Sequence, residues 1–385
     1  MARSLYRPLQ VAITERMVSR RMSDPETQRY DFERRKNNAL SFVSSMQMDD
    51  EGIRYRYSAD CTQPTLYSSA YACMIYSLLG ELQRISQESK ARWIAYFDSM
   101  QSRQTGLFYD PVVKNKLFDD SDWWGARHLA LHMISAYTTL GGRPRYPFYF
   151  LRSYKDTNIL STWLDSHDWS ACFDHAQDID NKIMNIGCLL QYQRDHWQDS
   201  EAGDAVRFLQ DYLLDKMNAN TGLWGAYNPN DPVQVSRGVQ FAYHLLPIFL
   251  YDRRLEFNVN RLLEAALRTQ NKYGGFAPTP NSSACEDIDS IYILARLVAY
   301  APQYRERVLM ALKKAQAWVV VNQVDDGGFV FRLNEGMTYG HRQMMSRRNR
   351  GAMFPTWFRL LSLAYSTNAL QDISCLAVHC PGYYC

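Results

Sequence analysis

The stretch CEDIDSIYILARLVAY, residues 285–300, joins a group of acidic residues to a long apolar run. From Ser290 onward this run carries one charged residue, Arg296, so a helix formed by it should be buried on nearly every side. Five other apolar segments follow the same plan, each after a glycine or aromatic break and a polar loop. Their spacing defines a repeated unit of roughly 55–60 residues. The six segments begin near Tyr67, Trp123, Asn181, Gly238, Ser290 and Thr356.

A more amphipathic segment precedes each apolar one. In residues 205–217, 259–270 and 307–323, apolar side chains recur at intervals of three and four, with charges between them. This pattern is typical of a helix with one wet face. An inner ring of apolar helices inside an outer ring of amphipathic ones is an all-α (α/α)6 toroid. The sequence therefore predicts a toroid built from six helical hairpins.

The repeats also suggest how the chain is divided. They occupy residues 31–370, which we expect to form a single toroid domain. Residues 1–30 are expected to be an N-terminal helical extension, and residues 371–385 a C-terminal tail without a clear pattern. A chain of 385 residues, 46% of them hydrophobic, is long enough to bury a large core.

Charge and cysteine content narrow the choice of partners. The net charge of +3 gives no reason to expect nucleic acid. No apolar run approaches the ~18 residues of a transmembrane helix, so only peripheral membrane contact stays open. The eight cysteines are scattered and none forms a Cys-x-x-Cys motif, as expected for reduced thiols. We therefore expect a cytoplasmic protein.

A glutamine–glycine–aromatic motif recurs in the breaks. Its best copies are QNKYGGF, residues 270–276, and QVDDGGF, residues 323–329. Glycine suits the left-handed turn that ends a helix, which gives the motif a structural interpretation. The motif also resembles the glutamine–aromatic repeats of the squalene/oxidosqualene cyclase and protein prenyltransferase superfamily, with Phe where that family usually has Trp. The resemblance implies a toroid with an internal cavity and an isoprenoid substrate, although the same toroid also serves carbohydrate-cleaving enzymes.

Acidic pairs stand just before three of the apolar segments. In a toroid the loops that lead into the inner helices gather at one mouth, so these acids would face one another. One Asp can cap each helix, a contribution of about 1 kcal/mol, but its partner two residues away has no such task. Converging carboxylates raise some pKa values or attract a cation. We therefore expect catalytic acids here: Asp289 first, tuned by Asp287 and Glu286, then Asp178 and Asp180. The third pair, Asp120 and Asp122, is expected to bind substrate.

One chemistry that fits these acids is protonation. A buried, protonated Asp donates a proton to an alkene or epoxide, and aromatic faces stabilise the resulting carbocation. Asp287-x-Asp289 is similar to the D-x-D-D motif of class II terpene cyclases. The resemblance implies that Asp289 gives the proton, while Ser290 replaces the last Asp of the motif.

The second chemistry is metal-assisted. If the substrate is a diphosphate, Asp pairs can hold Mg²⁺, and Arg237, Arg348 or Arg350 can hold phosphate. No other cofactor is expected. A zinc site is not expected either, because Asp60-Cys61 lacks the intervening residue of the Asp-x-Cys motif of protein prenyltransferases.

Further residues near the expected mouth are candidates for substrate binding. Taken singly, each aromatic residue is explained by core packing, and His128 by a satisfied core histidine. Together they can line an isoprenoid cavity or stack on sugar rings. The candidates are Asp60, Tyr67, Asp120, Asp122, Trp123, Trp124, His128, Trp169, Trp224, Arg237, Tyr292, Tyr339, His341, Arg348, Arg350 and Trp357.

Three functions compete on this sequence. The preferred one is a terpene cyclase-like enzyme acting on an apolar isoprenoid substrate. The alternatives are a carbohydrate-active toroid, either a glycosidase or a polysaccharide lyase, and a non-catalytic toroid that binds a lipid or protein. The cavity lining separates them: apolar walls below the acids favour the first, an open polar groove the second and a filled core the third.

Overall fold

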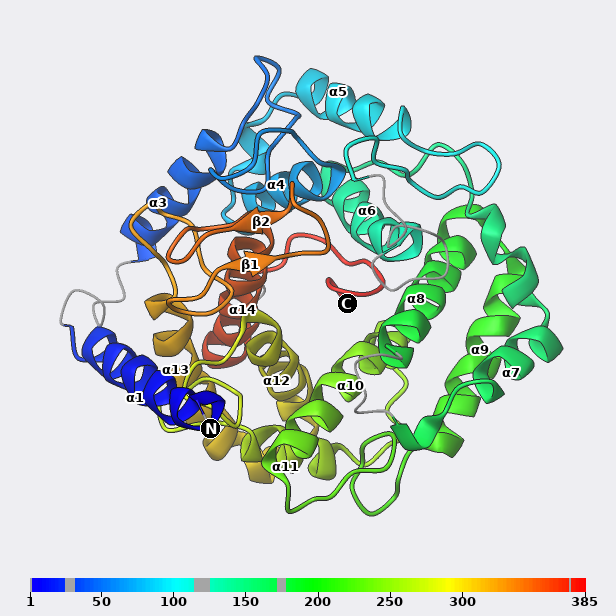
Figure 1. Cartoon of the computed structure of the whole chain (residues 1–385). Coiled ribbons are helices and arrows are strands. Elements are labelled where there is room, and N and C mark those ends of the chain that lie inside the picture. The colour runs from blue at the N-terminus through cyan, green and yellow to red at the C-terminus, as the bar shows by residue number, and fades with distance from the viewer. Residues whose placement is uncertain (1, 25–31, 114–124, 172–177, 374) are drawn as a thin grey trace.

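The computed structural model describes residues 2–24, 32–113, 125–171, 178–373 and 375–385. In this part of the chain six helices form an inner ring and six surround it, so the predicted (α/α)6 toroid is confirmed (Figure 1). The inner helices are α4 (Leu66–Leu78), α6 (Ala126–Leu140), α8 (Ile179–Trp197), α10 (Pro232–Tyr251), α12 (Ala284–Leu297) and α14 (Met353–Gln371). The outer helices are α3 (Phe32–Ser45), α5 (Gln87–Asp98), α7 (Thr157–Asp165), α9 (Ser200–Lys216), α11 (Val259–Arg268) and α13 (Arg305–Val321).

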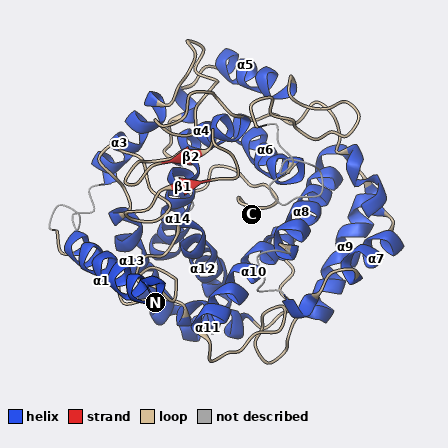
Figure 2. Cartoon of the chain, viewed as in Figure 1, coloured by secondary structure: helices blue, strands red, loops and turns tan. Residues whose placement is uncertain are grey.

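The remaining elements are short or peripheral (Figure 2). Helix α1 (Ala2–Met22) lies against α13, where Arg21 Nη1 donates to the Val321 carbonyl at 3.0 Å. Strands β1 (Met337–Thr338) and β2 (Met345–Ser346) form an antiparallel hairpin in the loop before α14. The described residues also form the short 3-10 helices η1 (Leu82–Arg84), η3 (Tyr149–Lys155), η4 (Trp169–Ala171), η5 (Val298–Tyr300) and η6 (Pro302–Tyr304). Within the described ranges, no helix is long and apolar enough to cross a membrane.

The two rings bury different amounts of their surfaces. In α14 every residue from Met353 to Ser366 is buried, whereas amphipathic α11 buries only Leu262, Leu263, Ala265 and Ala266. Helices α8, α10 and α12 also begin earlier than their apolar runs. Helix α10 starts at Pro232 rather than near Gly238, because the Asp231 carboxylate accepts hydrogen bonds from two backbone amides of the first turn. The sequence pattern missed these first turns because they are polar.

The glutamine of the repeated motif ties neighbouring hairpins together. Gln270 Nε2 donates to the Gly274 carbonyl at 3.0 Å and to the Ala311 carbonyl of α13 at 2.8 Å. Gln323 Nε2 makes the equivalent bonds to Gly327 at 2.9 Å and to Arg35 of α3 at 3.0 Å. The last hairpin is thereby joined to the first. The motif stabilises turns between units, a task that any α/α toroid presents whatever its substrate.

Residues 380–385 lie inside the inner ring (Figure 1). All six are buried, although the sequence showed no pattern here. Trp357 Nε1 donates to the Tyr384 hydroxyl at 3.0 Å, and the Tyr292 hydroxyl and the Cys385 thiol lie 2.8 Å apart. The tail therefore packs as part of the core rather than lying outside the toroid.

Candidate active site

A cavity of about 770 Å³ lies where α8, α10 and α12 begin. Its lining has two chemical characters. Helices α8 and α10 contribute Asp178, Asn181, Gln234, Ser236, Arg237, Gln240 and His244, while α14 and its preceding loop contribute Phe331, Tyr339, Phe354 and Phe358. Asp289 of α12, His128 of α6 and Tyr383 of the C-terminal tail also line the cavity. The cavity is therefore polar along one group of helices and aromatic along another.

Asp289 is a buried acid that lines this cavity. Its side chain is 2% exposed. Burial raises the pKa of Asp289 well above its ordinary value; the Arg237 charge opposes the rise, and the negative charges of Glu286 and Asp180 add to it. Its carboxyl group is consequently held in the protonated form, ready to donate a proton into the cavity.

Asp180 lies behind the cavity wall and binds His244. It is 1% exposed, and His244 Nδ1 lies 2.7 Å from Asp180 Oδ2. Burial acts to raise the pKa of Asp180, but the attraction and hydrogen bond of His244, together with Arg237, outweigh burial and lower it. An ionised carboxylate only accepts hydrogen bonds, so Nδ1 of His244 carries the proton. In the uncharged form of this ring the bare nitrogen is Nε2, which can act as a general base.

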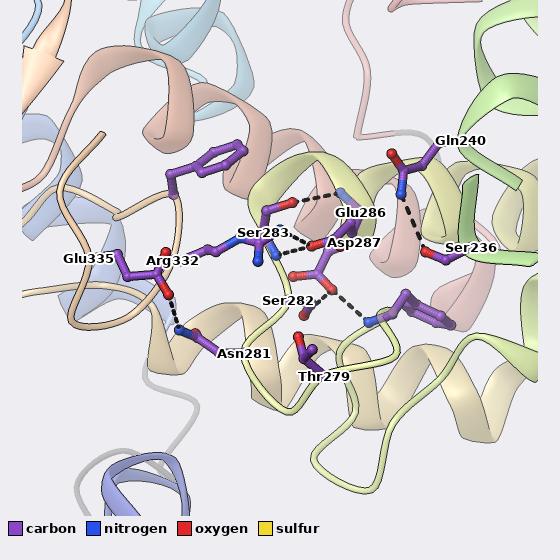
Figure 3. A network of polar contacts seen from close by, with 12 residues as sticks. Ser236, Gln240, Thr279, Asn281, Ser282, Ser283, Glu286, Asp287, Arg332 and Glu335 are labelled. Atoms are coloured by element: carbon purple, nitrogen blue, oxygen red, sulfur yellow. Dashed lines mark hydrogen bonds and ion pairs between the residues drawn. The ribbon is translucent and has the colours of Figure 1, made fainter. Parts of the chain in front are cut away.

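Three side chains one to two turns apart project from α10 into the cavity. Arg237, Gln240 and His244 follow a spacing of three and four, which places them on one helix face. Arg237 Nη1 donates to Gln240 Oε1 at 2.7 Å, and Gln240 Nε2 donates to Ser236 Oγ at 3.3 Å (Figure 3). Arg237 Nε is buried without a hydrogen-bond partner. This donor is available to an acceptor that a ligand would bring.

Glu286 is occupied by the start of α12. Ser283 Oγ accepts from the Glu286 amide at 3.2 Å, and Glu286 Oε2 accepts from the Ser283 amide at 2.7 Å (Figure 3). This is a capping box. Arg332 Nη2 also donates to Glu286 Oε2 at 2.8 Å. The cap of α12 is therefore Ser283, and Asp287 and Asp289 lie inside the helix rather than before it.

Asp287 belongs to a fully buried network and does not line the cavity (Figure 3). It forms an ion pair with Arg359, and both side chains are 0% exposed. Its oxygens also accept from the Phe276 amide at 2.8 Å, Ser282 Oγ at 2.6 Å and Trp318 Nε1 at 2.8 Å. With both oxygens engaged, Asp287 joins the motif turn at Phe276 to three helices. We assign it a structural role.

His128 meets the cavity from α6. Its Nδ1 lies 2.8 Å from the Tyr67 hydroxyl. Burial, with repulsion from His132 and His244, lowers the pKa of His128 well below its ordinary value. The imidazole is therefore neutral. The sequence left two interpretations of His128 open, a satisfied core histidine and a substrate-binding residue, and the structure gives it both a hydrogen bond and a place in the cavity lining.

Of the other predicted binding residues, Arg237, Tyr339 and His128 line the cavity. Asp60 accepts from the Arg347 amide at 2.9 Å and fixes the hairpin loop. The remaining described ones lie elsewhere: Trp224, Tyr292 and Trp357 are core residues, Trp169 packs on Tyr212 and Phe241, and His341, Arg348 and Arg350 are outside the lining. Asp120, Asp122, Trp123 and Trp124 lie outside the described residues.

Several lining residues were missed by the sequence interpretation. His244 had a usable signal, because it is an ionisable residue in an apolar inner helix, seven positions after Arg237. Tyr383 had none, because no periodicity marks the tail. Among the described residues, no three His, Cys, Asp or Glu side chains gather closely enough to hold a metal ion.

Solved structures with a similar fold are carbohydrate-active enzymes. A glycosyl hydrolase family 88 protein from Bacteroides vulgatus has a TM-score of 0.50 and 10% identity, and the alignment covers 88% of this chain and 98% of that one. A polysaccharide lyase has a TM-score of 0.49 and 11% identity, and the alignment covers 88% of this chain and 98% of that one. An unsaturated glucuronyl hydrolase from Bacillus sp. GL1 has a TM-score of 0.48 and 13% identity, and the alignment covers 89% of this chain and 97% of that one. No protein-family model and no curated protein matches the sequence.

The predicted kinship with squalene/oxidosqualene cyclases and protein prenyltransferases is wrong, because the matching toroid is that of a glycosyl hydrolase. The terpene cyclase reaction and the isoprenoid partner are wrong with it. The motif that suggested them stabilises turns between hairpins. The cavity also lacks the uniformly apolar wall that an isoprenoid chain would need, since Arg237, Gln240 and His244 line it.

Proposed function

We propose that this protein is an enzyme that cleaves a glycosidic bond by hydrolysis. The observation that carries the proposal is the pair of proton-transfer groups in one cavity. Asp289 is a carboxyl group held protonated, and His244 is oriented by an ionised Asp180. Opposed shifts of neighbouring titratable groups are the usual sign of an acid and base assignment. The toroid shared with a glycosyl hydrolase supports the same reaction class.

In the proposed reaction Asp289 is the general acid. Its carboxyl group protonates the oxygen of the leaving sugar as the glycosidic bond breaks. His244 Nε2 takes a proton from the attacking water, and the oxygen of that water forms the new bond to the sugar. Asp180 touches no substrate. It acts as a positioning residue that holds the imidazole in the correct tautomer and stabilises the positive charge that develops on it.

The lining also suggests the kind of sugar. Aromatic side chains such as Phe354 and Tyr339 offer flat apolar faces, while Gln240 and Asn181 offer hydrogen bonds. A pyranose ring presents both types of surface. The unpartnered Nε of Arg237 favours a substrate with a carboxylate, because guanidinium groups bind that group most strongly. We therefore propose an acidic sugar as the substrate.

The test is product analysis in water enriched in ¹⁸O. Purified protein is incubated with aryl glycosides of neutral sugars, aryl glycosides of uronic acids and uronic-acid oligosaccharides, and products are identified by mass spectrometry. Hydrolysis incorporates one ¹⁸O into the new sugar end. Asp289→Asn is expected to lower kcat by roughly 10²–10⁴-fold. The matched control is Asp215→Asn, an exposed carboxylate on outer helix α9. Full turnover by Asp289→Asn contradicts the assignment.

A second reaction, β-elimination, is favoured by one observation: the base is an imidazole rather than a carboxylate. In that reaction His244 removes the proton next to the sugar carboxylate, a carbon–carbon double bond forms, and Asp289 protonates the departing oxygen. The same experiment separates the two reactions. Elimination gives an unsaturated sugar with new ultraviolet absorbance and no ¹⁸O.

A further inference from the structure

Residues 379–385, here called the plug segment, enter the inner ring from the end opposite the cavity mouth. His379 stacks on Tyr251, the last residue of α10, with ring centroids 4.7 Å apart. Thr138 Oγ1, near the end of α6, donates to Cys380 Sγ at 3.5 Å. Three residues later, Tyr383 lines the cavity. The segment therefore runs from the ends of α6 and α10 towards the cavity and reaches the cavity lining at Tyr383.

The plug segment is held in one conformation by its own turn. The Cys380 amide donates to the Tyr384 carbonyl at 3.1 Å, which closes the turn. Gly382 has a φ of +92°, and a Cβ at this position would meet Leu131 Cδ1 at 3.0 Å. A residue with a side chain would therefore be strained here. The Tyr365 hydroxyl donates to the Tyr383 carbonyl, so the backbone beside the turn is fixed to α14 as well.

The ring of Tyr383 is packed on three sides. Its centroid lies 5.0 Å from Trp357, 4.9 Å from His132 and 5.8 Å from Phe358. Burial raises the pKa of Tyr383, so its hydroxyl stays protonated. Tyr383 and Asp289 line the same cavity.

His132 offers a polar atom next to that ring. Its Nε2 is buried without a hydrogen-bond partner, and its ring centroid lies 4.9 Å from that of Tyr383. The ring of Tyr383 therefore contacts both the cavity and a core side chain with an unsatisfied nitrogen.

We propose that Tyr383 forms the floor of the sugar site and determines how large a substituent the deepest sugar can carry. This inference rests on the proposed function. With the ring in place, the cavity ends at Tyr383 and accepts the unsubstituted sugar. Removing the ring extends the cavity to His132 Nε2, which can then bond a polar substituent such as an acetamido group.

The test measures binding, in an Asp289→Asn background so that nothing is turned over. Dissociation constants are determined by calorimetry for a set of acidic sugars and for the same sugars carrying a methoxy or acetamido group at each position in turn. Tyr383→Ala should change the preference between plain and substituted sugar by about 10-fold or more at one position, as pockets that differ by small groups do. Tyr383→Phe should retain the preference, and Tyr383→Trp should sharpen it.

Two results overturn the proposal. One is a preference that stays within about twofold at every position in Tyr383→Ala. If Tyr383→Ala does not fold, the proposal is overturned when Tyr383→Trp leaves the preference between plain and substituted sugar unchanged. Failure of the proposed function looks different, because then no sugar binds even with Tyr383 intact. Phenol binding distinguishes failure of this proposal from failure of the proposed function. If Tyr383 is the floor, the enlarged cavity of Tyr383→Ala takes up phenol whether or not sugars bind. If Tyr383→Ala takes up no more phenol than the protein with Tyr383 intact, Tyr383 is not the floor of the cavity.

Discussion

Replacing Asp289 by Asn should stabilise the protein, whereas the same change two residues away should destabilise it. Because the pKa of Asp289 is raised in the folded state, its proton is retained on folding and lost on unfolding above about pH 4. Stability then falls as the pH rises from the unfolded pKa to the folded pKa, by about 1.4 kcal/mol per pH unit. Asn carries no such penalty.

Replacing Asp287 by Asn should lower the stability of the protein instead. It is fully buried and paired with Arg359, which is fully buried too. Asp287→Asn leaves the guanidinium without its counter-charge, and breaking such a pair costs about 3–5 kcal/mol. The two substitutions therefore change the stability in opposite directions, and only the effect of Asp289→Asn should grow with pH.

Urea unfolding followed by circular dichroism between pH 4.5 and 7.5 measures both effects. Asp289→Asn should match the unmodified protein near pH 4.5 and exceed it increasingly towards neutral pH. Asp287→Asn should be less stable throughout. If Asp289→Asn is destabilised at neutral pH, or its effect does not change with pH, then Asp289 is ionised in the folded protein and the acid assignment fails.

Three further substitutions test the roles of His244, Arg237 and Gln323. His244→Gln removes the proposed base, so kcat should fall by roughly 10²–10⁴-fold; a profile of kcat/KM against pH that is unchanged in height and shape argues against the Asp180–His244 pair. Arg237→Gln should raise KM for a uronic-acid substrate by about tenfold or more and leave neutral aryl glycosides unaffected, and equal effects on both would show that Arg237 does not read the carboxylate. Gln323→Ala removes the hydrogen bonds of Gln323 Nε2 to the Gly327 and Arg35 carbonyls. It should cost about 1–3 kcal/mol in urea unfolding with kcat unchanged, whereas no loss of stability would contradict a linking role of the motif.

The fold was accessible from the sequence because it repeats. Six apolar runs at regular spacing fix the inner ring, and the amphipathic runs between them fix the outer one. Helix starts were less accessible, since the first turns are polar and capped by residues such as Asp231. The error about kinship has a physical origin too. Gln270 and Gln323 bond to carbonyls of the next hairpin, and that connection carries no information about what the cavity binds.

The site was accessible only in part. The sequence placed Asp287 and Asp289 together before α12, but both lie within the helix, where residues two apart point to nearly opposite sides. One therefore enters the core and the other the cavity. Asp180 lies at the start of α8 but behind the cavity wall, and its partner His244 is on another helix, 64 positions away. Tyr383 lies in a segment whose position depends on tertiary contacts alone.

The central claim is that a protonated carboxyl group and an ionised one coexist at this site at neutral pH. Infrared difference spectra between the unmodified protein and Asp289→Asn measure this directly, with Asp180→Asn as the paired sample. The account predicts a protonated carboxyl band at pH 7 that disappears in Asp289→Asn and persists in Asp180→Asn. A spectrum in which Asp289→Asn removes only a carboxylate band would contradict it.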